Sequence, residues 1–217
     1  MLSIQTFTFN AFSENTYVVS DETGAAIVID PGCYTRDEQL QLSTYVETHK
    51  LEIKLLLNTH CHIDHVLGNE FVKDKYHVPL LLHKIEEPQL RAVKNYAPLY
   101  GFDGYRGAEP DGFIDTMELI SFGNTNWSIL FLPGHSPGHV GFYDDHEKIL
   151  FGGDVLFAGS IGRTDLPGGD FDTLIKSIHQ QIFTLSDNVV VYPGHGPTTT
   201  VGEEKISNPY CALSLTR

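Results

Sequence analysis

The chain carries, directly after the short apolar segment 53–57, the run Asn58-Thr59-His60-Cys61-His62-Ile63-Asp64-His65. Four potential metal ligands stand close together in this run: His60, His62, Asp64 and His65. Residues two positions apart at the end of a strand point the same way, so the first two histidines can share one metal. The other two ligands lie past the turn and can reach a second metal. Imidazole and carboxylate together suit zinc, iron or manganese, so the run indicates a metal site.

Three further candidate ligands follow apolar segments later in the chain. His135 lies in Pro133-Gly134-His135-Ser136-Pro137-Gly138, Asp154 follows Gly152-Gly153, and His195 lies in Pro193-Gly194-His195-Gly196-Pro197. Neighbouring glycines let the backbone turn sharply and approach closely. A lone histidine of this kind is usually structural. Three ligands at equivalent strand ends, beside the dense run at 58–65, indicate one functional edge.

The order of the expected elements favours an α/β fold in one domain spanning 1–217. We expect strands at 5–9, 15–20, 25–30, 53–57, 78–82, 127–132, 140–143, 149–151 and 189–192. We expect helices at 37–49, 69–76, 86–96 and 171–185, the last capped by Asp170. The early strands are spaced like hairpins, whereas later strands alternate with helices. Mixed sheets are therefore expected rather than one parallel sheet.

The composition of the chain limits the kinds of binding partner that are expected. The net charge is −14, from 28 acidic and 14 basic residues, and the basic residues are scattered singly, so nucleic acid is not an expected partner. No signal peptide and no apolar run of about 20 residues is visible, which predicts a cytoplasmic chain without a membrane segment. The three cysteines, Cys33, Cys61 and Cys211, do not form a disulfide framework. A monomer or a small homo-oligomer is expected.

The run at 58–65 together with His135, Asp154 and His195 resembles the ligand set of the metallo-β-lactamase superfamily, in the same order along nearly the whole chain. The resemblance implies a four-layer αββα sandwich of two mixed β-sheets with the site at one edge. It also implies two divalent metal ions. His60, His62 and His135 would bind the first metal, Asp64, His65 and His195 the second, and Asp154 both.

Within the superfamily, the chain is most similar to small bacterial members of the glyoxalase II group. This similarity rests on 153–157, on 162–170, and on 192–199 followed by Glu203-Glu204 and Asn208-Pro209-Tyr210. The helical domain that follows in full-length glyoxalase II has no counterpart after His195. Arg163 stands where glutathione thioesterases bind the glycine carboxylate, and we expect it to contact the substrate. Asp165, however, stands where those enzymes place an aromatic residue.

The resemblance implies hydrolysis of a small-molecule thioester, S-lactoylglutathione or a related hydroxyacyl thioester. In this hypothesis a metal-bridging hydroxide attacks the carbonyl, and Asp64 and Asp154 are the catalytic residues that hold the hydroxide and its metals. Zinc is the favoured metal, with iron or manganese as alternatives. One rival is a persulfide dioxygenase with a single iron bound by His60, His135 and Asp154. Another is a lactonase of the same fold, and a third is a metal-holding protein without activity.

Other residues near the candidate ligands have structural interpretations. His139 is expected to support a ligand rather than to bind metal. Cys61 should point away from its neighbours and be buried. Asp30 is expected to anchor a loop or to accept a hydrogen bond from a ligand. The aromatic residues at 96, 100, 102 and 105 fit a substrate pocket and core packing equally well.

Overall fold

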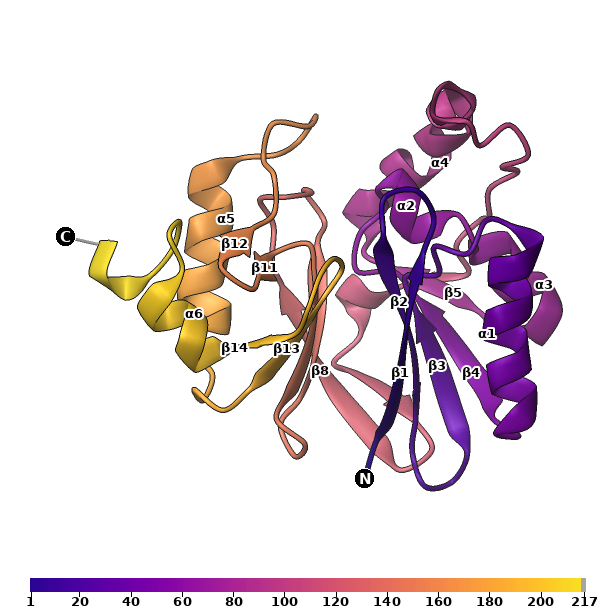
Figure 1. Cartoon of the computed structure of the whole chain (residues 1–217), viewed down its shortest axis with the longest axis horizontal. Helices are drawn as coiled ribbons and strands as arrows, with labels where there is room; N and C mark the ends of the chain where they lie inside the picture. The colour runs from indigo at the N-terminus through magenta and orange to yellow at the C-terminus, as the bar shows by residue number, and fades with distance from the viewer. Residues whose placement is uncertain (216–217) are drawn as a thin grey trace. The chain divides into compact units, whose positions relative to one another are not determined.

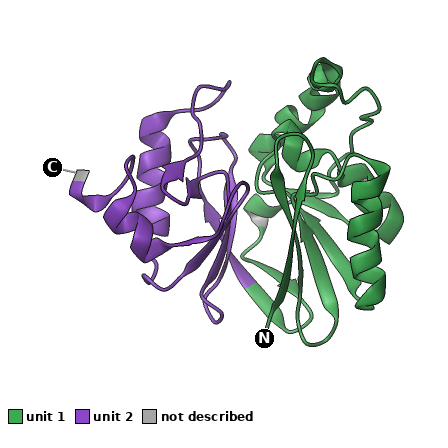
Figure 2. Ribbon diagram, viewed as in Figure 1, with its two compact units in different colours: residues 1–126 green, residues 127–217 purple. Residues whose placement is uncertain are grey.

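The computed structural model describes residues 1–215, apart from the side chains of residues 116 and 215. The chain divides into two compact units, Met1–Asn126 and Trp127–Arg217 (Figure 2). Each unit contains strands and helices. The division into units does not test the single domain that was expected to span 1–217, which stays a prediction. No helix among the described residues is long and apolar enough to cross a membrane.

The first unit is built on a six-stranded sheet whose strands follow one another in chain order. Its strands are β1 (Ser3–Phe9), β2 (Glu14–Ser20), β3 (Ala25–Ile29), β4 (Glu52–Leu57), β5 (Leu80–Leu82) and β6 (Gly112–Phe113). The pairs β1–β2 and β2–β3 are antiparallel, whereas β3–β4, β4–β5 and β5–β6 are parallel. The sheet is therefore mixed, as expected. The parallel strands end at a common edge, where the run at 58–65 begins.

The helices of this unit are α1 (Arg36–Thr48), α2 (Ile63–Val66), α3 (Asn69–Tyr76) and α4 (Glu87–Tyr96), with 3-10 turns η1 (Lys84–Glu86), η2 (Ala97–Tyr100) and η3 (Ile114–Thr116). Thr35 and Glu38 form a capping box that begins α1. Leu42 of α1 and Val72 of α3 share one buried cluster with Leu56 of β4. Figure 1 shows α1 and α3 on the same side of the sheet.

The second sheet has the order β14-β13-β10-β9-β8-β7. Its strands are β7 (Leu119–Phe122), β8 (Thr125–Phe131), β9 (Val140–Asp144), β10 (Ile149–Gly153), β13 (Val190–Pro193) and β14 (Thr199–Thr200). β7 precedes the division between the units, and β8 crosses it. The pair β10–β13 is parallel, and β8–β9 and β9–β10 are antiparallel, so this sheet is also mixed.

The second unit also holds a hairpin of β11 (Leu156–Phe157) and β12 (Ser160–Ile161). Its helices are α5 (Phe171–Ser177), which continues into a π-helical turn η4 (Ile178–Ile182), and α6 (Val201–Ser207), followed by the 3-10 turn η5 (Leu213–Leu215). The Asp170 side chain accepts a hydrogen bond from the Thr173 amide, which confirms the expected cap of α5. Leu174, Ile178 and Val201 pack in one cluster with Leu150 and Val191 of the sheet.

The expected α/β class with two mixed sheets is confirmed, and most expected elements are present. The expected helix 171–185 is wrong in its later part, because the α-helical pattern ends at Ser177 and widens into a π turn before Phe183. Several elements were not expected from the sequence: β6, β7, β11, β12, β14, α2 and the seven-residue helix α6. Segments of two to four residues are too short for an alternating pattern of apolar residues to be recognised.

Candidate metal centre

The ligand run of the first unit lies where β4 ends. His60 and His65 are fully buried, and their ring centroids are 4.1 Å apart, while the rings of His60 and His62 are 4.7 Å apart. His62 precedes the short helix α2, which carries Asp64 and His65. The distance from Asp64 Oδ2 to His65 Nε2 is 3.6 Å. The turn into α2 therefore brings the four expected ligands of this unit close together.

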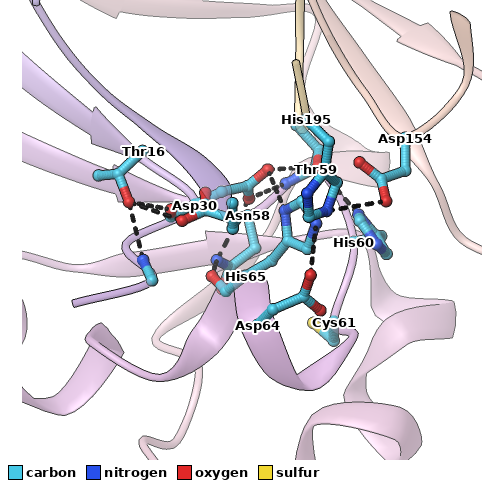
Figure 3. A network of polar contacts seen from close by, with 12 residues as sticks. Thr16, Asp30, Asn58, Thr59, His60, Cys61, Asp64, His65, Asp154 and His195 are labelled. Carbon is cyan, nitrogen blue, oxygen red and sulfur yellow. Dashed lines mark hydrogen bonds and ion pairs between the residues drawn. The ribbon is translucent and has the colours of Figure 1, made fainter. Parts of the chain in front are cut away.

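Asp30 orients two of these histidines from the end of the neighbouring strand β3 (Figure 3). Its Oδ2 atom accepts hydrogen bonds from the Thr59 hydroxyl at 2.5 Å and from His65 Nδ1 at 3.1 Å, and its Oδ1 atom accepts one from the Thr59 amide at 2.7 Å. Because the Thr59 hydroxyl donates to Asp30, it is free to accept from His60 Nδ1, 3.1 Å away. Both imidazoles therefore hold their proton on Nδ1 and present Nε2 as a ligand.

Asp30 also stands close enough to His60 and His65 to be considered a ligand, since one atom of each lies within 4.8 Å of the others. Both of its carboxylate oxygens already accept hydrogen bonds from protein groups. This arrangement is typical of an acceptor behind metal-bound histidines rather than of a ligand. The expected role of Asp30 as an anchor and acceptor is confirmed.

We expect Asp30→Asn to lower zinc affinity by about 10- to 100-fold, the usual cost of losing a carboxylate behind metal-bound histidines. The asparagine side chain has one acceptor oxygen, whereas the donors of Thr59 and His65 now bind to two carboxylate oxygens. Competition for zinc with a chromophoric chelator would measure the change. Asp37→Asn, on the exposed first turn of α1, is the matched control and should bind zinc as the unaltered protein does. Equal affinities for Asp30→Asn and its control would contradict this role.

The ligands of the second unit stand at the ends of strands in the second sheet. His135 follows β8, Asp154 follows β10, and His195 follows β13, the parallel neighbour of β10. Asp154 Oδ2 lies 3.6 Å from His135 Nε2 and 3.4 Å from His195 Nε2. Two ligands of one tetrahedral zinc, each about 2.1 Å from the ion, are separated by about 3.4 Å. The carboxylate is therefore placed to share a metal with each histidine.

Backbone groups fix the orientation of these ligands. His135 Nδ1 lies 2.7 Å from the carbonyl oxygen of Arg163, which can only accept, so the proton is on Nδ1 and Nε2 is the ligand atom. His139 is fully buried, and its Nε2 accepts the Asp154 amide at 3.0 Å. His139 thus holds the backbone of the expected ligand Asp154. This contact agrees with the supporting or structural role that was expected for it.

The donor set fits divalent metal ions. His60, His65 and His135 each direct Nδ1 to an oxygen of the protein and keep Nε2 for a ligand bond. Asp64 and Asp154 supply carboxylate oxygens 3.4–3.6 Å from histidine nitrogens of their own units. Neutral imidazoles and hard carboxylate oxygens suit zinc, and also iron and manganese.

Arg163 has a partner that the sequence did not predict. Its Nε and Nη2 atoms donate to the two carboxylate oxygens of Asp165, at 2.7 and 2.8 Å. These hydrogen bonds from Arg163 are the largest cause of the lowered pKa of Asp165, which falls to about 2, so the carboxylate is charged at neutral pH. The fork of Arg163 thus already binds a carboxylate of the chain itself.

Two further buried residues, Cys61 and Glu86, lie in or against the run at 58–65. Cys61 is fully buried, and burial raises the pKa of its thiol well above the usual value, as fits a small buried side chain. Its amide donates to the buried Glu86 at 2.9 Å. The sequence offered no signal for this contact, because Glu86 stood at the start of an expected helix with no sign of a buried partner.

The structure separates the aromatic residues of this region. Phe102 is buried and meets Tyr34 edge to face, with ring centroids 4.9 Å apart, which is core packing. Burial and then the charge of Asp64 raise the pKa of Tyr96 to about 12, so its hydroxyl is neutral at physiological pH. Tyr100 is exposed by 57%, and its ring lies 6.1 Å from that of Tyr96. Tyr96 and Tyr105 both pack against the buried cluster that contains Phe102. The substrate-pocket interpretation of Tyr96, Tyr100 and Tyr105 stays a prediction.

The chain matches the family model of the metallo-beta-lactamase superfamily over residues 10–195. It is 36% identical to the hydroxyacylglutathione hydrolase GloC of Haemophilus influenzae over 211 residues, which cover 96% of this chain and 98% of that protein. The chain therefore belongs to the metallo-β-lactamase superfamily. The seven expected ligands all lie within the matched residues.

Solved structures agree with this assignment. The crystal structure of the B3 metallo-β-lactamase BLEG-1 superimposes with a TM-score of 0.87 at 35% identity, covering 97% of this chain and 99% of that one. The structure of TTHA1623 in a di-iron-bound form gives a TM-score of 0.82 at 34% identity, covering 95% and 99%. The fold is thus the metallo-β-lactamase sandwich, and the chain is a metallo-hydrolase of this superfamily. The named relatives differ in chemistry, so substrate and metal need a separate argument.

Proposed function

We propose that the chain hydrolyses a small-molecule thioester, S-lactoylglutathione or a related hydroxyacyl thioester, with two divalent metals held by the seven expected ligands. The observation that carries the proposal is the position of Asp154, whose Oδ2 lies 3.4–3.6 Å from the Nε2 atoms of two histidines. These distances allow Asp154 to share a metal with each histidine, and the arrangement that we propose is a bridge between two metals, as the family resemblance implies. His60, His62, Asp64 and His65 complete the set.

The chain's own residues hold and orient this site. When bound, two divalent metals would polarise the substrate carbonyl and lower the pKa of water toward neutrality. The Thr59 hydroxyl, held by Asp30, faces Nδ1 of His60, while Asp30 and the Arg163 carbonyl face Nδ1 of His65 and His135, so Nε2 of each ring is left for a metal bond. His139 holds the Asp154 backbone. Preorganised ligands of this kind reduce the rearrangement needed when the metals bind.

A thioester is the favoured substrate for two reasons. A relative that shares 36% identity over nearly the full length of both chains is named a hydroxyacylglutathione hydrolase. In addition, a thiolate leaves with a low pKa and needs no strong general acid. Zinc is the proposed metal.

The proposal is tested by metal content and by hydrolysis of S-lactoylglutathione, measured on the same freshly purified sample. We expect two metals per chain and turnover that is lost with a chelator and regained with zinc. One iron per chain, with oxygen consumed in the presence of glutathione persulfide and no hydrolysis, would instead establish the persulfide dioxygenase. Faster turnover of an acyl homoserine lactone than of the thioester would establish the lactonase.

We expect Asp165→Asn to lower the KM for S-lactoylglutathione by about two- to five-fold, the scale of an exposed ion pair, with kcat unchanged. If Arg163 binds the substrate carboxylate, the substrate has to displace Asp165, and a neutral amide competes less well. A neutral thioester without the carboxylate should keep its KM. Asp172→Asn, exposed at the start of α5, is the control. Unchanged KM for both thioesters would exclude Arg163 from carboxylate binding.

A further inference from the structure

Glu204 is a buried carboxylate of α6 that the proposed chemistry does not use. The residue is only 3% exposed. Both oxygens are occupied. Oε1 accepts the Thr199 hydroxyl at 2.6 Å, Oε2 accepts Asn208 Nδ2 at 2.6 Å, and the Gly159 amide points at both, at 3.2 and 3.0 Å. Burying a carboxylate is costly unless donors compensate it, and here three donors do.

One of these contacts, and a second from Asn208, reach the turn of the β11–β12 hairpin. Phe157 pairs with Ser160, so the turn consists of residues 158 and 159, and Gly159 has a positive φ of +68°, as the second central residue of a type II turn does. Glu204 binds the Gly159 amide. Asn208, itself 1% exposed, donates to the Ser160 carbonyl at 3.0 Å. Helix α6 and Asn208 at its end therefore hold the tip of the hairpin through the backbone amide of Gly159 and the backbone carbonyl of Ser160.

One arm of this hairpin leads to the expected ligand Asp154, and the other leads to the backbone acceptor of the expected ligand His135. Asp154 stands two residues before β11. The Gly162 amide, one residue after β12, donates to the Val155 carbonyl at 3.2 Å and closes the base of the hairpin. The next carbonyl, that of Arg163, accepts His135 Nδ1 at 2.7 Å. A shift of the hairpin would therefore move Asp154 and the acceptor of His135 together.

We propose that Glu204 is a positioning residue of the metal centre, which acts by fixing the β11–β12 hairpin that carries Asp154 and the acceptor of His135. The inference rests on the proposed function, because it takes these two residues as metal ligands. A carboxylate suits this place because all three of its neighbours are donors. A glutamine of the same shape would direct its own N–H groups at one of those donors.

The test compares Glu204→Gln with Glu203→Gln, the exposed neighbour on the same turn of α6. Zinc affinity is measured by chelator competition at a temperature where both variants are folded. Hydrogen exchange of the amides at 155–162 is followed in the metal-free proteins. We expect Glu204→Gln to bind zinc about 10-fold more weakly, within the range for outer partners of ligands, and to exchange these amides faster. Glu203→Gln should match the unaltered protein in both.

A variant with a smaller change keeps the inference testable if Glu204→Gln does not fold. Thr199→Val keeps the side-chain shape and removes one donor to Glu204, so zinc affinity should fall by a few-fold. A lower melting temperature for these variants, with zinc affinity and hairpin exchange unchanged, would overturn the inference and leave Glu204 as an anchor of α6 alone. If the unaltered protein binds no zinc while the hairpin exchange of Glu204→Gln still rises, the proposed function fails and the link from Glu204 to the hairpin stands.

Discussion

Replacing Asp154 with alanine is expected to remove both metals and thioester hydrolysis together. Its Oδ2 atom lies 3.4 and 3.6 Å from the Nε2 atoms of His195 and His135, so the change takes a ligand from each metal of the proposed pair. Because losing even an outer partner of a ligand costs about 10- to 100-fold, we expect kcat/KM to fall by more than about 100-fold.

Metal analysis and S-lactoylglutathione turnover on one preparation would check this result. Asp172→Ala, which removes an exposed carboxylate from the same unit, is the control and should keep both metals. A variant at position 154 that retains two metals and full turnover would contradict the bridging role. Retention of one metal with loss of turnover would place Asp154 on a single metal.

Gly162→Ala is expected to be the most damaging single-methyl change near the site. A Cβ atom at this position would lie 1.9 Å from the Asp154 carbonyl oxygen and 3.1 Å from His135 Nδ1. Neither neighbour can move freely, because His139 holds the Asp154 amide and the Arg163 carbonyl holds His135. Crowding of this kind costs about 1–3 kcal/mol or more of folding free energy, and relief of it would displace both ligands.

Urea unfolding of the metal-free protein and a zinc titration would measure the two effects of Gly162→Ala. Gly159→Ala is a useful comparison, because its Cβ would meet nothing within 4 Å. That substitution carries only the strain of an alanine at φ +68°, about 1 kcal/mol. If both variants bound zinc equally well, close packing at Gly162 would have no part in placing the ligands.

The expected ligands could be predicted because four of them lie within the six residues 60–65 and the others follow apolar segments. The segments 25–30 and 53–57 are long enough to be recognised as buried strands, and parallel neighbours end at one edge of a sheet. Asp30 and the run after residue 57 therefore lie together, although the pairing of these two strands was not predicted. Whether the seven ligands of both units form one centre stays a prediction, which rests on the family resemblance.

Other features depend on contacts that no local pattern reveals. The strand β14 has two residues, and α6 contains Gly202 in its first turn, so neither has a clear periodicity. The burial of Glu204 and Glu86 follows from amide donors that approach from distant segments. The pairing of Arg163 with Asp165 depends on side-chain rotamers, and it changes what the arginine can offer a substrate.

The backbone of Asp30 restricts which amino acids this position tolerates. Its φ of +48° is a conformation that glycine, asparagine and aspartate adopt most readily. Glycine has no acceptor for Thr59 and His65, and asparagine has one oxygen where two are used. Aspartate alone meets both demands. In a saturation library at position 30 selected for activity, almost all active variants should carry aspartate, and a few should carry asparagine. The position should therefore be among the least tolerant of substitution in the chain.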